Sequence, residues 1–114
     1  MSDVQSDAVT DEIRALNNHC RCTFSGCSIM LTAAVAAMEP EAKAKLLEAV
    51  RTFDAFNDDN DPHGEADMAF LDIDGERYFF KWDYYDPSMK FGAEDPSDPA
   101  KCRRVLTIGM ASDY

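Results

Sequence analysis

The residues best suited to chemistry lie together in one short acidic stretch, residues 57–67, which reads NDDNDPHGEAD. The stretch contains His63, one of only 2 histidines in the chain, among several carboxylates. Carboxylate oxygens and a histidine nitrogen can bind a divalent cation, and a histidine beside a carboxylate can act as a general base. We therefore treat this stretch as the first candidate for a metal, ligand or catalytic site.

A β-hairpin is predicted directly after the acidic stretch. Alternating apolar residues favour strands over residues 66–73 and 76–85, and the second strand is rich in aromatic residues. The Asp74-Gly75 pair between them is typical of a two-residue type I′ turn. Such a turn fixes which residues of the two strands face each other. The register of the hairpin can therefore be extended backward into the acidic stretch.

The extended register predicts that His63 faces Asp86. Since side chains alternate across a strand, one face of the hairpin should begin in the core and end in a polar cluster. A His63–Asp86 contact would hold the histidine in one tautomer, which suits a general base or a metal ligand. We expect this face to carry Ile73, Leu71, Ala69, Tyr78, Phe80 and Trp82, followed by Asp67, Glu65, His63, Tyr84 and Asp86.

One interpretation of this polar cluster is purely structural. Pro62 and Gly64 favour a turn, so the strand could begin only after them. Asn60 or Asp61 could cap backbone N–H groups through Asx-turns, and His63 could bond a carboxylate and fix the loop. The cluster would then be an ordered turn without a ligand.

Two functional interpretations remain beside the structural one. A hard cation such as Mg²⁺, Mn²⁺ or Ca²⁺ could be held by oxygen and imidazole donors, and the candidate metal ligands are Asp61, His63, Glu65 and Asp67. For catalysis, the candidates are His63 and Asp86. Residues 59–70 imitate the start of an EF-hand loop, but Phe70 stands where that loop requires a bidentate glutamate. An EF-hand is therefore excluded.

The net charge of −11 belongs to one part of the chain. Residues 54–98 hold fourteen acidic and three basic side chains, whereas the remainder holds eight of each. Direct nucleic-acid binding requires a basic footprint, so this distribution argues against it. Solubility, cation binding and docking onto a basic protein surface remain open. A small basic patch (Lys101, Arg103 and Arg104) is expected to pair with the acidic loops, with anion binding as the alternative.

The 4 cysteines are interpreted as reduced thiols. Cys20, Cys22 and Cys27 form with His19 the pattern H-C-x-C-x4-C, which does not match the spacing of a structural zinc site. The N-terminus lacks the basic and apolar blocks of a secretion signal, and no apolar run approaches the ~20 residues that cross a bilayer. We therefore expect a cytoplasmic protein without a membrane partner.

The predicted elements form one α+β domain over residues 10–114, after a flexible N-terminus over residues 1–9. We expect an antiparallel sheet of about five strands with two helices packed on one face. Beyond the hairpin, the predicted strands cover residues 21–24, 27–31 and 104–110, and the predicted helices cover residues 10–18, with Thr10 as the N-cap, and 41–53.

The aromatic strand also predicts a partly exposed patch on the face away from the helices. Its odd positions Phe79 and Tyr85 would join Met68 and Phe70 there, unless a loop such as residues 87–101 folds over them. Such a patch is typical of an interaction surface. Taken together, the candidate ligand or interaction residues are Asp61, His63, Glu65, Asp67, Asp83, Tyr85 and Asp86.

Several motifs of the chain resemble a known family. They are residues 13–17, the run NDPHGEAD, the Asp-Gly hairpin, the strand KWDYYD and the closing RVLTI. In these motifs the chain is similar to small bacterial proteins catalogued as domain of unknown function 3768, over about residues 12–114. The resemblance implies no chemistry. It implies a context, since such proteins are carried by plasmids and other mobile elements among anti-restriction and plasmid-maintenance genes.

Two classes of function follow from these observations. The first is an acidic interaction protein that docks onto a basic protein surface, including an accessory or anti-defence inhibitor that mimics the charge of nucleic acid. The alternative is a metal-dependent hydrolase or ligand-binding domain centred on the NDPHGEAD run. The first is preferred, because the motif does not supply a complete catalytic set.

Overall fold

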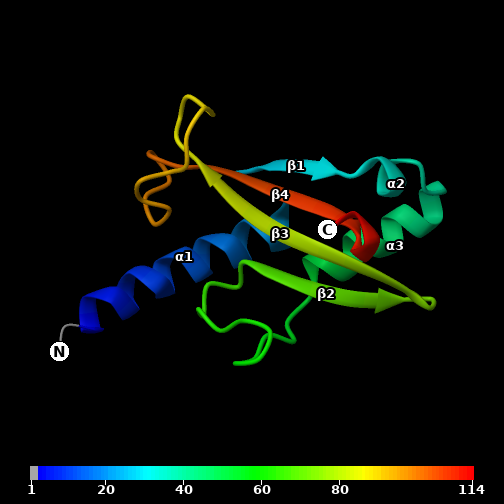
Figure 1. Cartoon of the computed structure of the whole chain (residues 1–114), viewed down its shortest axis with the longest axis horizontal. Helices are drawn as coiled ribbons and strands as arrows, with labels where there is room; N and C mark the ends of the chain where they lie inside the picture. Colours follow the sequence, from blue (N-terminus) through cyan, green and yellow to red (C-terminus); the bar gives the residue numbers. More distant parts are fainter. Residues whose placement is uncertain (1–2) are drawn as a thin grey trace.

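A four-stranded sheet organises the chain in the computed structural model, which describes residues 3–114, with α1 side chains from Ala8 onward (Figure 1). The predicted α+β class is confirmed. In chain order the elements are α1 (Asp3–Thr23), β1 (Ser28–Leu31), α2 (Ala33–Ala36), α3 (Pro40–Arg51), β2 (Met68–Ile73), β3 (Glu76–Tyr85), β4 (Arg103–Met110) and the short 3₁₀ helix η1 (Ala111–Asp113).

The sheet is mixed, which corrects the prediction of an antiparallel sheet of about five strands. The strand order is β1-β4-β3-β2, and β1 runs parallel to β4. β2, β3 and β4 are antiparallel neighbours, as expected for a hairpin and a following strand. β1 pairs with the last strand of the chain, so most of the sequence lies between the two partners. A local pattern contains no information on the direction of such a distant partner.

Helix α1 is longer at both ends than predicted. Thr10 lies inside the helix and is not its N-cap, and residues 21–23 are helical where a strand was expected. The buried residues of α1 recur every three or four positions, as Ile13, Asn17, Cys20 and Arg21. Burial of this stripe against the sheet keeps its end helical. Residues 1–2 of the predicted flexible N-terminus lie outside the described residues, and α1 begins at Asp3.

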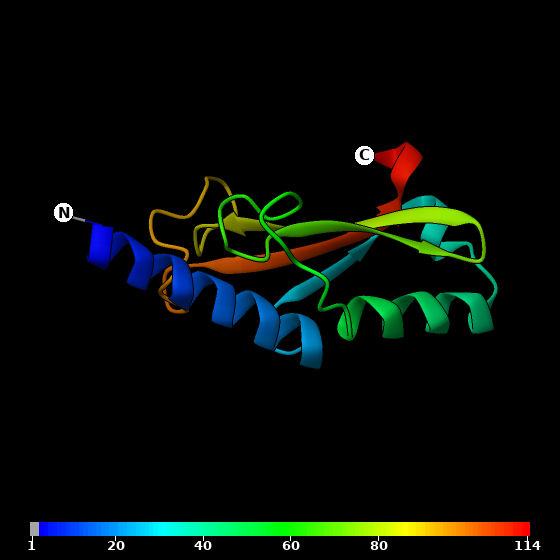
Figure 2. The ribbon, with the colours of Figure 1, turned by 90° about the horizontal axis from the view of Figure 1, so that it is seen from below.

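The helices cover one face of the sheet. Figure 2 shows α1 and α3 on the same face, nearly end to end along the long axis of the molecule. Helix α3 confirms the predicted second helix, with Pro40 in its first turn and Leu46 and Val50 fully buried. In the described part of the chain, no helix is long and apolar enough to span a membrane.

The hairpin register is confirmed from Met68 to the turn. Ile73 pairs with Glu76 and Ala69 pairs with Phe80, as the Asp-Gly turn predicts. The inner face therefore carries the expected apolar residues toward the helices. Its core consists of Ala69, Tyr78, Phe80, Trp82, Leu106 and Ile108 from the sheet, packed on Cys20, Val35, Leu46 and Val50 from the helices.

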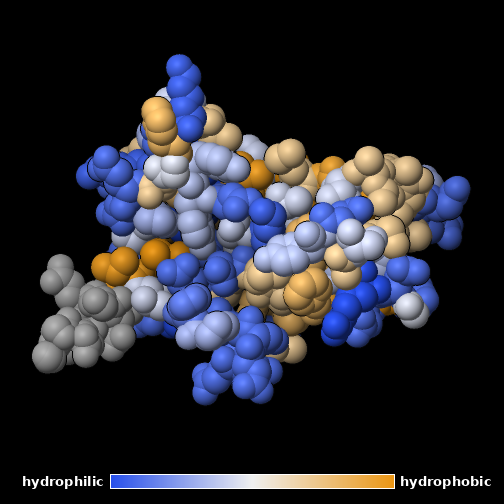
Figure 3. All heavy atoms as spheres, in the orientation of Figure 1, coloured by the Kyte–Doolittle hydropathy of each residue, from blue (hydrophilic) through white to orange (hydrophobic). Residues whose placement is uncertain are grey.

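The outer face is covered in part by the C-terminus. Phe79 was expected to be partly exposed, yet it is only 2% exposed. The ring of Tyr114 lies 5.1 Å from the Phe79 ring and 5.7 Å from the Phe70 ring, so Tyr114, and not residues 87–101, covers this part of the face. Phe70 remains 41% exposed, and Figure 3 shows apolar atoms on this side of the molecule.

Candidate functional site

The acidic loop, defined as residues 54–67, is an ordered turn closed by its own asparagines. The Asn57 side-chain oxygen accepts from the backbone N–H of Asp59 at 2.8 Å and of Asn60 at 3.0 Å. The Asn60 side-chain oxygen accepts in return from the Asn57 N–H at 2.7 Å, and its amide donates to the Ala55 carbonyl. The predicted Asx-type capping is confirmed for Asn60.

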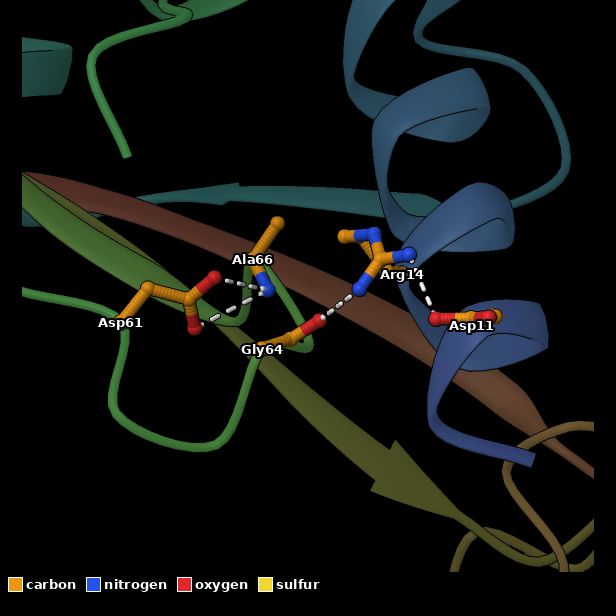
Figure 4. Close-up of polar contacts among 5 residues, drawn as sticks. All are labelled: Asp11, Arg14, Asp61, Gly64 and Ala66. Carbon is orange, nitrogen blue, oxygen red and sulfur yellow. Dashed lines mark hydrogen bonds and ion pairs between the residues drawn. The ribbon is translucent and has the colours of Figure 1, made fainter. Parts of the chain in front are cut away.

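Asp61 closes the second half of the loop (Figure 4). Its two carboxylate oxygens accept from the backbone N–H of Ala66 at 3.2 and 3.0 Å, and its carbonyl accepts from the Gly64 N–H. Ala66 has φ +54° and Gly64 has φ +71°, so the chain turns through two left-handed residues. This conformation costs an alanine roughly 1 kcal/mol, and the charge-assisted hydrogen bonds that the Ala66 N–H donates to Asp61 offset that cost.

Helix α1 fixes the acidic loop through two side chains. Arg14 donates from Nη1 to the Gly64 carbonyl at 2.9 Å and from Nη2 to the Asp11 carboxylate at 2.6 Å (Figure 4). Asn17, one helical turn later, donates to the Glu65 carbonyl at 3.0 Å. The loop is therefore fixed on the helix by its backbone, and its carboxylates are not used for this attachment.

Asn17 also joins the loop to the sheet in a buried polar network. Its amide donates to the Tyr84 hydroxyl at 2.7 Å, and its oxygen accepts from Nε of Arg104 at 2.9 Å. The Arg104 guanidinium lies 5.2 Å from the centroid of the Tyr84 ring. Asn17 is fully buried and Arg104 is 4% exposed. All the hydrogen-bonding groups of the Asn17 amide thus have partners, as a buried amide requires.

The predicted His63–Asp86 contact is not formed. His63 is exposed, and no hydrogen bond or ion pair joins it to Asp86 within residues 3–114. The register ends where the Asp67 carbonyl accepts from the Trp82 N–H at 2.8 Å. Beyond that point, the place beside β3 is taken by residues 91–93, since Ala93 donates to the Tyr84 carbonyl and Tyr85 pairs with Gly92.

Asp86 has a local structural role in this second turn. Its carboxylate accepts from the Ser88 hydroxyl at 2.7 Å and more weakly from the backbone N–H groups of Lys90 and Phe91. The bond from the Ser88 hydroxyl is the main cause that lowers the pKa of Asp86 below its ordinary value. The Asp86 carboxylate therefore stabilises the turn at residues 86–91.

The candidate metal ligands are near one another but do not converge. Burial raises the pKa of Glu65, and the negative charges of Asp67 and Asp61 raise it further, while His63 and Arg104 oppose this rise. The Asp61 carboxylate is directed at the Ala66 N–H, and the His63 side chain is exposed. Within residues 3–114, no group of three or more histidine, cysteine or acidic side chains is arranged to hold a metal ion.

The remaining candidate interaction residues lie on the other face of the sheet. Asp83 forms an ion pair with Lys81 at 3.0 Å, and Tyr85 is half-buried beside Gly92. Their odd positions on β3 place both side chains on the outer face, away from Asn17 and the acidic loop. The predicted site residues are therefore divided between two faces of the molecule.

Sequence reasoning missed Asn17, and it placed Arg104 in a basic patch without predicting its part in the buried network. The position of each residue in its element indicates that its side chain is buried. Asn17 is a polar residue on the buried stripe of α1, and Arg104 alternates with Leu106 and Ile108 on the inner face of β4. A polar residue at a core position requires a partner in the fold.

The four thiols are free, and the residues of the H-C-x-C-x4-C pattern do not converge on one point. Cys20 is buried, and Cys22, two positions later on the same helix, is exposed. Positions two apart on a helix point in different directions, so the pattern cannot converge on one ion. Burial raises the pKa of Cys20 and Cys102, and it raises the pKa of Cys27 to about 11.

Comparison with known proteins gives a family without a function. A family model described as "Protein of unknown function (DUF3768)" matches residues 31–113. No curated protein and no solved structure matches the chain.

Proposed function

The chain belongs to the DUF3768 family, whose function is unknown, and on this premise we propose that it is an acidic interaction module that docks onto a basic surface of a partner protein. The observation that carries the proposal is the acidic loop. Its backbone is fixed by hydrogen bonds, while the side chains of Asp58 and Asp59 are exposed and have no bonding partner in the described part of the chain.

The fixed backbone supports recognition by the acidic loop. A flexible loop loses conformational freedom when it binds, which weakens the complex. Here the Asn57–Asn60 bonds, the Asp61–Ala66 bonds and the donors of α1 order the loop before any partner arrives. In Figure 1 the loop projects below β2, and hydrophilic atoms cover this region in Figure 3.

The charge of residues 54–98 supports a basic partner. Within the described residues, only Asp72, Asp74 and Asp83 of its fourteen acids form ion pairs, with Arg77, Lys45 and Lys81 respectively. The other carboxylates leave a surplus of negative potential around the loop and beyond β3. Such a field speeds association with a positively charged surface and disfavours nucleic acid.

The partner class that best fits this charge is a nucleic-acid-binding protein. Its cationic surface would otherwise bind phosphates, so the module would inhibit it by occupying that surface. The mobile-element context implied by the family resemblance agrees with a defence protein of the host as the partner. This identity of the partner is part of the proposal.

The test compares two double variants that remove the same number of charges. D58N/D59N neutralises the acidic loop, and E39Q/E41Q neutralises two exposed glutamates at the start of α3. Binding to immobilised poly-L-lysine is measured by interferometry over a series of NaCl concentrations. We expect D58N/D59N to weaken binding several-fold more than E39Q/E41Q, because the loop is the contact surface.

Equal weakening by the two double variants would contradict the proposal, since binding would then depend on total charge alone. Circular dichroism of each variant checks that the fold is retained. Asp86 is unsuitable for this test, because its carboxylate fixes the turn at residues 86–91.

A further inference from the structure

We propose that the groove around Arg104 binds a small molecule through its oxyanion group, a phosphate or a carboxylate, with Arg104 and Arg103 as the recognition residues. We define the Arg104 groove as the space between the C-terminal half of α1, the turn at Gly26 and the loop at residues 96–102. This site lies apart from the acidic loop surface of the proposed function and does not depend on it.

Two adjoining cavities form the groove. They have volumes of about 180 and 590 Å³ and share Gly26, Pro99, Cys102 and Arg104. The smaller cavity extends to His19 under α1, and the larger one extends to Arg103 and Met89. Together they reach the size of ordinary small-molecule sites, which are roughly 300–1,000 Å³. The walls combine apolar and thiol groups with two guanidinium groups, as such sites do.

Arg104 is a buried cation that lacks a carboxylate partner. In the described residues its guanidinium donates only to neutral acceptors, namely the Asn17 oxygen, the Pro96 carbonyl at 2.5 Å and the Cys102 sulfur at 3.4 Å. A guanidinium has five N–H groups, so two remain available. A buried charge is costly unless it is paired, and an oxyanion in the groove would accept from these donors.

The basic patch acts on the acidic loops only at longer range: the charge of Lys101 lowers the pKa of Asp95, and that of Arg104 lowers the pKa of Glu65. Within residues 3–114, no ion pair involves Lys101, Arg103 or Arg104. Neither cavity has an acidic residue in its lining, although the chain carries a net charge of −11. The side-chain contacts therefore favour the alternative hypothesis, that the basic patch is an anion site.

The charges of the two arginines act on the thiols that line the groove. Burial raises the pKa of Cys20, Cys27 and Cys102, and Arg104 opposes this at all three. At Cys102, Arg104 and Arg103 both have larger effects than Asp95, the acidic group that acts on this thiol from the loop. The positive field of the two arginines thus covers the shared part of both cavities.

The two arginines differ in what they can contribute. Arg104 is buried and held by three acceptors, so it offers fixed donors at the inner end of the groove. Arg103 is exposed and lines the larger cavity, so it supplies a second charge near solvent. Planar guanidinium groups match phosphate and carboxylate oxygens in geometry. Met89 and Pro99 provide apolar contacts for the rest of the ligand.

The experiment titrates the chain with inorganic phosphate, phenyl phosphate and benzoate at constant ionic strength, with chloride as the reference anion. Binding is followed by amide shifts in two-dimensional NMR and by thermal melting. We expect saturable shifts at residues 25–28 and 99–104 and a rise in melting temperature. Phenyl phosphate should bind more tightly than inorganic phosphate, and comparison with benzoate distinguishes a phosphate from a carboxylate site.

Two charge-matched variants locate the site. Arg103→Gln should weaken binding about tenfold, because one charge-assisted hydrogen bond is lost, while Arg77→Gln on the outer face should leave the affinity unchanged. Arg103 is exposed, so its variant is expected to fold even if an Arg104 variant does not.

Cysteine alkylation gives an internal control in the unmodified chain. At about pH 9, phenyl phosphate should slow alkylation of Cys27, which lines the larger cavity, and leave the exposed Cys22 unaffected. The proposal is overturned if no probe gives saturable shifts, if the shifts lie away from residues 25–28 and 99–104, or if Arg103→Gln and Arg77→Gln bind equally well.

Discussion

At the scale of single residues, buried polar groups decide where the acidic loop lies. Asn17 contacts the loop, β3 and β4 at once, through the Glu65 carbonyl, the Tyr84 hydroxyl and the Arg104 guanidinium. Each of these partners would lose a bond inside the fold if the amide were removed. A buried polar group that loses its hydrogen-bond partner destabilises the fold more than an exposed one does, because water cannot replace the lost partner.

Asn17→Ala is accordingly expected to lower the free energy of unfolding by about 3 kcal/mol, since several buried groups lose their partner. Urea denaturation followed by circular dichroism measures this change. Asn18→Ala is the control on the same helix, because the half-buried Asn18 accepts one bond from Arg21. Arg21 keeps a second acceptor, the Phe53 carbonyl, so a loss below about 1 kcal/mol is expected for Asn18→Ala. Similar losses for both variants would contradict the central role of Asn17.

Glu65 gives a prediction on pH dependence. Burial and Asp67 raise the pKa of Glu65, so the folded chain binds its proton more tightly than the unfolded chain does. Stability from this group is therefore greatest at low pH and falls as the pH rises from the ordinary glutamate pKa of ~4.3 through the folded pKa. Glu65→Gln should raise the melting temperature at neutral pH, and this gain should disappear at low pH, where both forms are uncharged.

The control for Glu65→Gln is Glu76→Gln, an exposed glutamate at the hairpin turn that also removes one negative charge. Melting curves of the three proteins are compared across the acidic range. A gain for Glu65→Gln that persists unchanged at low pH would show that the buried carboxylate is not its cause.

At the scale of elements, the end of β2 and the path of residues 86–93 determine each other. β3 continues to Tyr85, but β2 pairs with it only as far as Met68, with one further bond that the Trp82 N–H donates to the Asp67 carbonyl. The free edge beyond is covered by residues 91–93, which leaves no unpaired strand edge there. The acidic loop is therefore displaced toward α1, where Arg14 and Asn17 bind it.

The close approach of β1, β4 and β3 requires a glycine at position 109. A Cβ there would lie 2.5 Å from Thr32 Cγ2 and 2.7 Å from Phe79 Cε1. Gly109→Ala should destabilise the fold by about 1–3 kcal/mol, because the neighbouring ring is buried and cannot move freely. Gly92→Ala is the matched control, since its Cβ would lie 3.9 Å from the nearest atom, the Tyr84 carbonyl oxygen.

Chemical denaturation of both glycine variants tests this difference. Gly92→Ala is expected to change the free energy of unfolding by less than about 1 kcal/mol, since the added methyl group has room. If Gly109→Ala is equally harmless, the packing at the Thr32–Phe79 contact is looser than the distances indicate.

At the scale of the whole molecule, the uneven charge acts on stability as well as on binding. Residues 54–98 carry the entire net charge of −11, and most of their carboxylates have no ion-pair partner in the described chain. Like charges repel one another in the compact state, and salt screens this repulsion. The chain should therefore be more stable as the salt concentration rises.

We expect the melting temperature to rise by several degrees as NaCl increases from roughly 0.02 to 0.3 M, a range over which the screening length falls well below the size of the fold. The rise should be smaller in D58N/D59N than in the wild type, and E39Q/E41Q should resemble the wild type. Differential scanning calorimetry measures this effect. A melting temperature that falls with salt would mean that the ion pairs outweigh the repulsion.

The sequence by itself determined the local structure of this protein. The Asp-Gly turn predicted the register of β2 and β3, alternation predicted the inner face, and Pro40 with its helical stripe predicted α3. These patterns depend on neighbouring residues, so they can be read along the chain. The resemblance that predicted the family rests on runs of the same local kind.

The tertiary structure alone decided the features that join distant segments. The parallel pairing of β1 with β4 and the cover of Phe79 by Tyr114 both involve partners far apart in the sequence. The same holds for the candidate sites, because the Asn17 network and the Arg104 groove assemble side chains from α1, β4 and two loops. The stability of these two clusters depends on burial and on contacts that exist only once the chain has folded.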